Sequence, residues 1–121
     1  VQGEPILMKS AGLQKRSYCY VFDCATAMLT VLLRGIAGEA YNISNKDAIV
    51  TIRRFAEILA EVSDTEVIFE KATDREAAGY NPMSSSALDA EKLESLGWTG
   101  MYPAKEGISD TLQILESERE R

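Results

Sequence analysis

Apolar residues recur three and four positions apart in several stretches of this chain, which is the spacing that gives a helix one buried face. The spacing predicts four helices, over residues 23–34, 52–62 and 90–96 and from Pro103 onward. The first three each have a side chain suited to be the N-cap, and these are Asp23, Thr51 and Asp89. Gly97 then ends the third helix.

Short runs of β-branched and aromatic residues predict strands over 5–9, 17–22, 39–44 and 66–71. Strand 39–44, helix 52–62 and strand 66–71 follow one another as a βαβ unit, which implies a parallel pair of strands. Residues 72–87 are polar and irregular, and loops of this length are usually functional or disordered. We therefore expect one small α/β domain over residues 1–121, with a parallel βαβ unit, short strands and about four helices.

The acidic charge balance narrows the class of partner. The 121 residues include 19 acidic and 13 basic side chains, which gives a formal net charge of −6. A surface that binds nucleic acid needs a basic face, so we expect no nucleic acid partner. No apolar run approaches the roughly 20 residues of a membrane helix, and no signal-peptide pattern is visible. We expect a cytoplasmic protein without a membrane partner.

Familiar catalytic motifs are absent from the sequence. It has no histidine and two cysteines, Cys19 and Cys24. Cys-His and Ser-His-Asp catalysis are thereby excluded, and a zinc site would lack ligands, so no metal is expected. There is no G-x-G-x-x-G turn and no P-loop. Both thiols are expected to be buried, Trp98 to lie in the core, and Asn42 to be a buried hydrogen-bonding residue.

A lone arginine follows a flexible turn in "SAGLQKRSYCY". The planar guanidinium of this residue, Arg16, suits phosphate oxygens because it can donate two parallel hydrogen bonds. Two interpretations stay open, an anion-binding residue and a solvated arginine at the start of a strand. The same two apply to Arg75 in the 72–87 segment. For Asp23, a catalytic role competes with the N-cap role, and the N-cap role explains the residue fully.

The order of four short motifs favours the anion-binding interpretation of Arg16. They read "GLQKRSYCYVFD", "GEAYNIS", "ALDAEKLESLGW" and "EGISDTLQIL". This order resembles the C-terminal part of an extended short-chain dehydrogenase/reductase. More narrowly, it is similar to the NAD-dependent epimerase/dehydratase family that acts on nucleotide sugars. The resemblance covers nearly the whole chain, and it is specific because the order and spacing of all four motifs agree.

The resemblance implies that catalytic and cofactor-binding residues lie elsewhere. In that family an N-terminal Rossmann domain binds NAD and carries a Tyr-x-x-x-Lys pair, and neither feature occurs here. These residues would then be a substrate-binding portion that is inactive alone. Arg16 would contact the diphosphate of the sugar nucleotide, with Gln14 and Tyr18 beside it. Many relatives carry a second arginine before the "LD-x-x-K" segment; here serines replace it, and Arg75 is the expected substitute.

Two functions are therefore expected as alternatives. The first is the substrate-binding portion of a nucleotide-sugar epimerase or dehydratase. The second is a self-standing, non-enzymatic α/β domain that binds an anion or a protein partner. Dimers are common in the resembled family, so a homo-oligomer is expected of the parent enzyme. A portion separated from its partner domain should also self-associate or expose an apolar patch.

Overall fold

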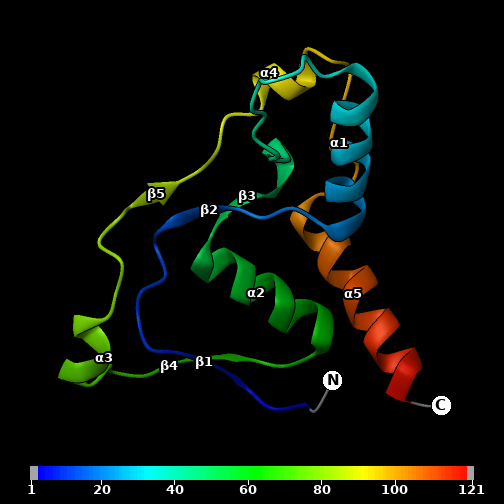
Figure 1. Ribbon diagram of the computed structural model, residues 1–121. Coiled ribbons are helices and arrows are strands. Elements are labelled where there is room, and N and C mark those ends of the chain that lie inside the picture. Colours follow the sequence, from blue (N-terminus) through cyan, green and yellow to red (C-terminus); the bar gives the residue numbers. More distant parts are fainter. Residues whose placement is uncertain (1–2, 120–121) are drawn as a thin grey trace.

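Short strands and five α-helices make up the part of the chain that the computed structural model describes, residues 3–119 (Figure 1). In chain order the elements are β1 (Ile6–Met8), β2 (Lys15–Ser17), α1 (Val21–Arg34), the 3₁₀ turn η1 (Lys46–Ala48), β3 (Ile49–Thr51), α2 (Ile52–Ser63), β4 (Val67–Phe69), α3 (Asp74–Ala78), β5 (Ser85–Ser86), α4 (Glu91–Glu94) and α5 (Ala104–Arg119). The expected fold class, a small α/β arrangement with short strands, is confirmed.

The strands form two small sheets. β2 is the central strand of one sheet, antiparallel to β3 and parallel to β5. β1 and β4 form a separate parallel pair, in which Ile6 lies opposite Val67. α2 lies between the two sheets in Figure 1 and leads from β3 toward β4. The parallel pair therefore exists, but its first strand is β1 and not the expected segment 39–44.

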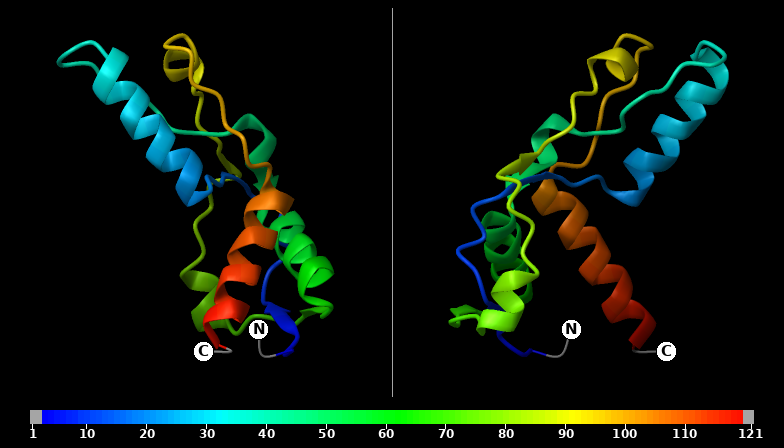
Figure 2. Two further views of the ribbon diagram at one scale, coloured as in Figure 1. Left: turned by 90° about the vertical axis from the view of Figure 1, so that its right-hand side faces the viewer. Right: turned by 60° about the vertical axis from the view of Figure 1, so that its left-hand side comes forward.

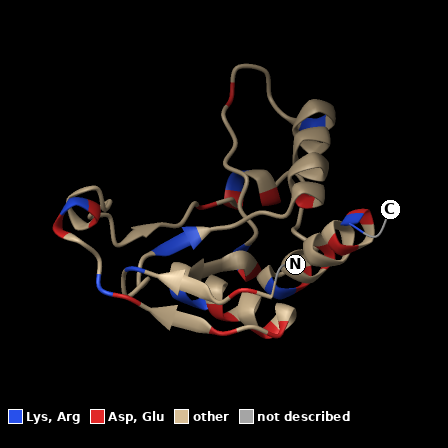
Figure 3. Cartoon of the chain, turned by 90° about the horizontal axis from the view of Figure 1, so that it is seen from below, with Lys and Arg blue, Asp and Glu red and all other residues tan. Residues whose placement is uncertain are grey.

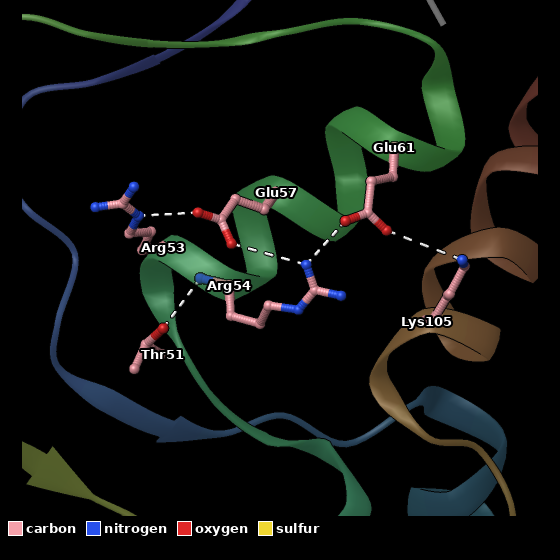
Figure 4. A network of polar contacts seen from close by, with 6 residues as sticks. All are labelled: Thr51, Arg53, Arg54, Glu57, Glu61 and Lys105. Carbon is pink, nitrogen blue, oxygen red and sulfur yellow. Dashed lines mark hydrogen bonds and ion pairs between the residues drawn. The ribbon is translucent and has the colours of Figure 1, made fainter.

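α2 is anchored at its start and along one face. Thr51 caps it as predicted, because its hydroxyl oxygen accepts a hydrogen bond from the Arg54 N–H at 3.0 Å. On the outer face, Arg54 pairs with Glu57 and Glu61, and Glu61 also reaches Lys105 of α5 (Figure 4). Exposed ion pairs of this kind contribute little, so burial of the inner face stabilises the helix more. That core consists of Ala48, Ile58, Ala104 and Ile108.

The start of α1 differs from the prediction. The helix begins at Val21 with Tyr20 in the N-cap position, so Asp23 lies within the first turn. β2 ends at Ser17, so only the first residue of the predicted strand 17–22 lies in a strand. Asp23 does not cap α1 because its carboxylate accepts hydrogen bonds from residues 101 and 102 instead.

Two other segments also differ from the prediction. Residues 39–44 form neither a strand nor a helix, and they pair with no strand among the described residues. Asn42 is exposed and not buried, although its Nδ2 donates a hydrogen bond to the Asp89 carbonyl oxygen at 2.9 Å. The polar segment 72–87 contains α3 and β5 and is therefore no structureless loop. Thr73 and Glu76 start α3 with a reciprocal capping box.

A second core cluster joins α1 to α4. It consists of Ala27, Leu93 and Trp98, which confirms the expected core position of Trp98. α4 is shorter than the predicted helix 90–96. Asp89 lies one position before its N-cap, and Oδ1 of Asp89 still accepts a hydrogen bond from the Glu91 N–H at 2.8 Å.

Candidate functional site

The turn before β2 fixes the position of Arg16. Gly12 has a φ of +63°, and its carbonyl oxygen accepts a hydrogen bond from the Arg53 N–H at 2.8 Å. A Cβ on Gly12 would lie only 2.8 Å from the Arg53 nitrogen, so the turn requires glycine. The chain then enters β2, where Arg16 lies opposite Val50 of β3 and Ser86 of β5. The backbone of Arg16 is thus held from both sides.

Within residues 3–119, the Arg16 guanidinium makes one polar contact. The side chain is half-buried, and Nη1 donates a hydrogen bond to the Lys15 carbonyl oxygen at 2.7 Å. It forms no ion pair with any carboxylate in residues 3–119. A guanidinium has five N–H donors, so several remain for an anion with more than one oxygen.

Gln14 and Tyr18 lie two positions on either side of Arg16, which places all three on the same side of an extended chain. The Oε1 atom of Gln14 is buried and has no hydrogen-bond partner among the described residues. The Tyr18 ring stacks on Phe55 with 4.1 Å between ring centroids. Burial raises the pKa of Tyr18, and the positive charge of Arg16 opposes that rise. Arg16 and Tyr18 are therefore near enough to interact electrostatically, whereas Gln14 is related to them only by the alternation of the chain.

Arg75 is not part of this group. It is exposed on α3, a helix that is tied to the end of β1. Glu76 pairs with Lys9 there, and the Tyr80 hydroxyl donates a hydrogen bond to the Lys9 carbonyl oxygen at 2.9 Å. In Figure 1, α3 lies well away from β2, beyond the β5 edge of the sheet. Arg75 makes no contact with Arg16 among the interactions of residues 3–119.

Two hollows in the described surface are lined by other residues than Arg16. One, of about 260 Å³, lies between η1 and α4. Its ionisable lining residues are Lys46, Asp89, Glu91 and Glu94. Three carboxylates against one ammonium group disfavour an anionic ligand. The other is a groove of about 640 Å³ between α2, α5 and residues 18–21, which Tyr18 lines and which has no charged residue in its wall. It suits an apolar partner better than a diphosphate.

Asp23 has a role that the sequence did not indicate. The residue is fully buried. Its Oδ1 accepts a hydrogen bond from the Met101 N–H at 2.9 Å, and its Oδ2 accepts from the Tyr102 N–H and from Asn45 Nδ2, both at 3.1 Å. Gly100 allows this packing, because a Cβ there would lie 2.3 Å from Asn45 Cγ. A carboxylate inside the apolar run "YVFDCATAM" was the available signal, since buried carboxylates need partners.

The Cys19 thiol offers little reactivity. Cys19 and Cys24 are free and half-buried, so they are less enclosed than expected. They flank the start of α1 at the two positions whose side chains usually meet as a hydrophobic staple. Burial, with a further contribution from Cys24, raises the pKa of Cys19 to about 12. Such a thiol is almost wholly protonated at neutral pH and is a poor nucleophile.

Cofactor-binding features are missing from the described residues. The glycines with positive φ are Gly3, Gly12, Gly38 and Gly97, and none lies in a G-x-G-x-x-G turn between a strand and a helix. Residues 3–119 also contain no cluster of three or more potential metal-ligating side chains. None of the helices in that range combines the length and apolarity needed to cross a bilayer. The described residues therefore lack the glycine-rich turn that binds NAD, and we assign no redox step to them.

Known proteins are similar to this chain in both sequence and fold. Residues 1–44 match the NAD dependent epimerase/dehydratase family. The dTDP-D-glucose 4,6-dehydratase of Mus musculus is 33% identical over 109 residues, which are 85% of this chain and 30% of the mouse protein. The dTDP-glucose 4,6-dehydratase 1 of Escherichia coli (strain K12) is 31% identical over 120 residues, 93% of this chain and 32% of that protein. The chain thus spans about a third of the curated relatives' length.

Solved structures agree on the fold. The dTDP-glucose 4,6-dehydratase of Bacillus anthracis in complex with NAD superposes with a TM-score of 0.77 at 24% identity, over 98% of this chain and 36% of that one. UDP-glucose 4-epimerase from Thermotoga maritima with UDP-glucose gives the same TM-score and identity, over 98% of this chain and 37% of that one. The sequence matches and the shared fold confirm the resemblance drawn from the motifs, because this chain is similar in sequence and in fold to NAD-dependent epimerases and dehydratases of nucleotide sugars.

Proposed function

We propose that this chain forms the substrate-binding portion of an NAD-dependent nucleotide-sugar epimerase or dehydratase, and that Arg16 holds the diphosphate of the sugar nucleotide. The observation that carries this proposal is that the backbone of Arg16 lies in the central strand β2, while its guanidinium forms no ion pair within residues 3–119. The names of the relatives support the substrate class, because they include dTDP-glucose dehydratases and an epimerase solved with UDP-glucose. They favour this function over a self-standing, non-enzymatic domain.

Arg16 and the residues near it would have different roles in binding the ligand. Arg16 would donate paired hydrogen bonds to oxygens of the diphosphate. Gln14 would be a weaker neighbour of the ligand, because its Oε1 is buried. Tyr18 would support Arg16 from the core side, since its ring is already stacked on Phe55. Arg75 would reach the ligand only from the separate α3 segment, so we expect a smaller contribution from it.

The role of these residues in catalysis would be positioning. Redox chemistry would belong to a dinucleotide-binding domain outside this chain, and we expect the chain alone to be inactive. A firm hold on the diphosphate fixes the sugar relative to the reacting groups, so binding energy from a part that does not react supports the chemical step. The homo-oligomeric state of the parent enzyme and its cytoplasmic location belong to the same proposal and remain predictions.

A titration of the ¹⁵N-labelled chain with UDP and with dTDP tests the assignment by nuclear magnetic resonance. We expect shifts concentrated in β2, in β5 and at the Arg16 Nε–H, with weaker binding of UMP because it has one phosphate fewer. Arg16→Ala should weaken UDP binding about tenfold to a hundredfold, since a hydrogen bond to a charged group contributes about 1.5–3 kcal/mol.

Lys15→Ala is the matched control. Lys15 is adjacent to Arg16, carries the same charge and is exposed, and alternation places its side chain on the other side of the strand. It should leave the affinity unchanged. Equal losses in the two variants would indicate general charge attraction, and unchanged affinity in Arg16→Ala would refute the assignment of the diphosphate to this residue.

A further inference from the structure

Two thiols stand side by side at the start of α1. Cys19 comes one position before the N-cap residue Tyr20, and Cys24 is the fourth residue of the helix. Side chains at these two positions usually meet. The Cys24 thiol donates a hydrogen bond to the Cys19 carbonyl oxygen at 3.8 Å. Burial raises the pKa of Cys19, and a hydrogen bond with the Cys24 thiol raises it further. The two sulfur atoms are therefore neighbours in the folded chain.

The surroundings of this pair do not suit a catalytic thiol. No lysine or arginine occurs between Arg16 and Arg34 in the sequence, and Figure 3 shows charge in α1 only near its two ends. The negative charge of Asp23 adds to the effect of burial in raising the pKa of Cys19. A nucleophilic thiol needs the opposite, a positive neighbour that stabilises its thiolate. What the pair offers is a second sulfur within reach of the first.

The residues between the two thiols join α1 to the start of α5. Tyr20 stacks against Tyr102 with 4.6 Å between the ring centroids. It also packs against Gly107, where a Cβ would lie 3.2 Å from the Tyr20 Cβ. Asp23 accepts hydrogen bonds from the backbone N–H groups of residues 101 and 102. A covalent bond between the thiols would enclose Tyr20 and Asp23 in one ring and so restrain this junction.

We propose that Cys19 and Cys24 form a reversible disulfide, which makes the junction between α1 and α5 sensitive to the redox state of the surroundings. The oxidant is a low-molecular-weight disulfide such as glutathione disulfide. Both thiols are half-buried, and Cys19 lines the 640 Å³ groove, from which a small oxidant would reach the pair. The chain contains no other cysteine, so every disulfide within one molecule joins these two residues. The proposal does not depend on the role of Arg16.

The reaction consists of two successive thiol–disulfide exchanges. Cys24 loses its proton to water, and its thiolate attacks one sulfur of glutathione disulfide. The bond between the glutathione sulfurs breaks, and the departing glutathione thiolate takes up a proton. Cys19 then loses its proton, attacks the Cys24 sulfur and releases the second glutathione thiolate, which is protonated in turn. The protein thiols thus lose two electrons and two protons, and glutathione disulfide gains them.

The order of the two steps follows from the environment of Cys19. Its pKa of about 12 leaves little thiolate for attack on an oxidant that is free in solution. The second exchange is intramolecular, and the nearness of the two sulfurs favours it. Cys19 is therefore assigned to the second exchange.

Equilibration with glutathione measures how well the fold places the two sulfurs. The chain would be incubated at a series of ratios of reduced to oxidised glutathione, first folded and then unfolded in urea. Free thiols would be trapped by alkylation, and mass spectrometry would count the disulfide. The disulfide within one chain should form more readily in the folded chain, by about tenfold or more, because unfolded polypeptide must first bring the sulfurs together. By linkage, the oxidised chain should unfold at a higher urea concentration than the reduced chain.

The variant Cys24→Ala, Ala25→Cys is the matched control. It keeps the composition and both thiols, but it moves the second thiol about 100° around α1. Ala25 is exposed, so this position accepts a larger side chain. Circular dichroism would verify that the variant folds, and its disulfide should form no more readily in the folded than in the unfolded chain.

Three results would overturn the proposal. The first is a wild-type disulfide that forms no more readily in the folded chain than in the unfolded chain, because the fold would then not hold the sulfurs together. This comparison needs no variant, so it stands even where the control fails to fold. The second is a folded control that forms its disulfide as readily as the folded wild-type chain. The third is a dimer linked by a disulfide in place of the ring within one chain.

Discussion

Asp23→Asn should destabilise the fold more than its small change in shape suggests. Among residues 3–119, Asp23 is the only buried side chain of a normally charged type. Its two oxygens accept three hydrogen bonds, from Met101, Tyr102 and Asn45, at 2.9–3.1 Å. These bonds connect the first turn of α1 to the segment that leads into α5. An amide has one acceptor oxygen in place of two, so one of the two positions becomes a donor that faces another donor.

The expected loss follows from those three bonds. The donor left without an acceptor costs about 1–3 kcal/mol, and each remaining bond weakens by about 1 kcal/mol when its acceptor is neutral. Relief from burying a charge offsets part of this. We therefore expect the free energy of unfolding to fall by about 2–4 kcal/mol.

Urea denaturation followed by circular dichroism measures this difference. Asp47→Asn is the matched control, because Asp47 is exposed and its side chain makes no hydrogen bond or ion pair with residues 3–119. It should change the free energy of unfolding by less than about 0.5 kcal/mol. If Asp23→Asn were as stable as this control, the three bonds would not be what holds α1 to the rest of the fold.

Two further predictions concern the approach to β2 and the anchor of α3. Gly12→Ala should lower the free energy of unfolding by about 2 kcal/mol or more, because Gly12 has a positive φ and a Cβ there would collide with the Arg53 backbone. Gly38→Ala should lower it less, because the φ there is +85° but the space is open. Equal urea midpoints for the two variants would contradict the contact with Arg53. A hydrogen bond from Lys9, and to a lesser degree those from Thr73, lower the pKa of Glu76 from the ordinary value of 4.5 to about 2. The ion pair therefore stabilises the fold fully above pH 4.5, and this stabilisation is lost as the pH falls toward 2. A ¹³C titration of the Glu76 carboxyl should show a midpoint near 2 that rises toward 4.5 in Lys9→Ala, whereas a wild-type midpoint near 4.5 would show that the ion pair does not form.

The helices were largely predictable because their signals are local. The apolar spacing and the Thr51 cap placed α2 almost to the residue. The capping box of Thr73 and Glu76 was a local signal as well, and it would have located α3 within the polar segment. The strands were harder, because each has at most three residues and is held by segments far away in the chain. No local pattern states that β2 pairs with residues on both sides of α2.

In the candidate site, too, local features could be predicted from the sequence and long-range contacts could not. The turn at Gly12 and the guanidinium of Arg16 could be recognised from the sequence, because a glycine turn and a lone arginine are visible in the residue order. Two other features could not be recognised, since both depend on packing between distant segments: Gln14 Oε1 has no hydrogen-bond partner within residues 3–119, and α3, which carries Arg75, lies away from β2. Figure 2 shows why distance along the chain misleads here, because α1 projects from the body away from α2, while α5, far along the chain, packs beside α2.

The failed strand prediction at residues 39–44 is informative in a different way. Its alternation of side chains is realised, since Tyr41 and Ile43 face the core while Asn42 faces outward. What is missing is the partner strand, which local sequence cannot supply because pairing depends on a neighbour. None of the backbone N–H or C=O groups of residues 40–44 makes a hydrogen bond within residues 3–119. The direction in which each side chain points is therefore a local property that the sequence predicts, whereas the pairing of the backbone is not.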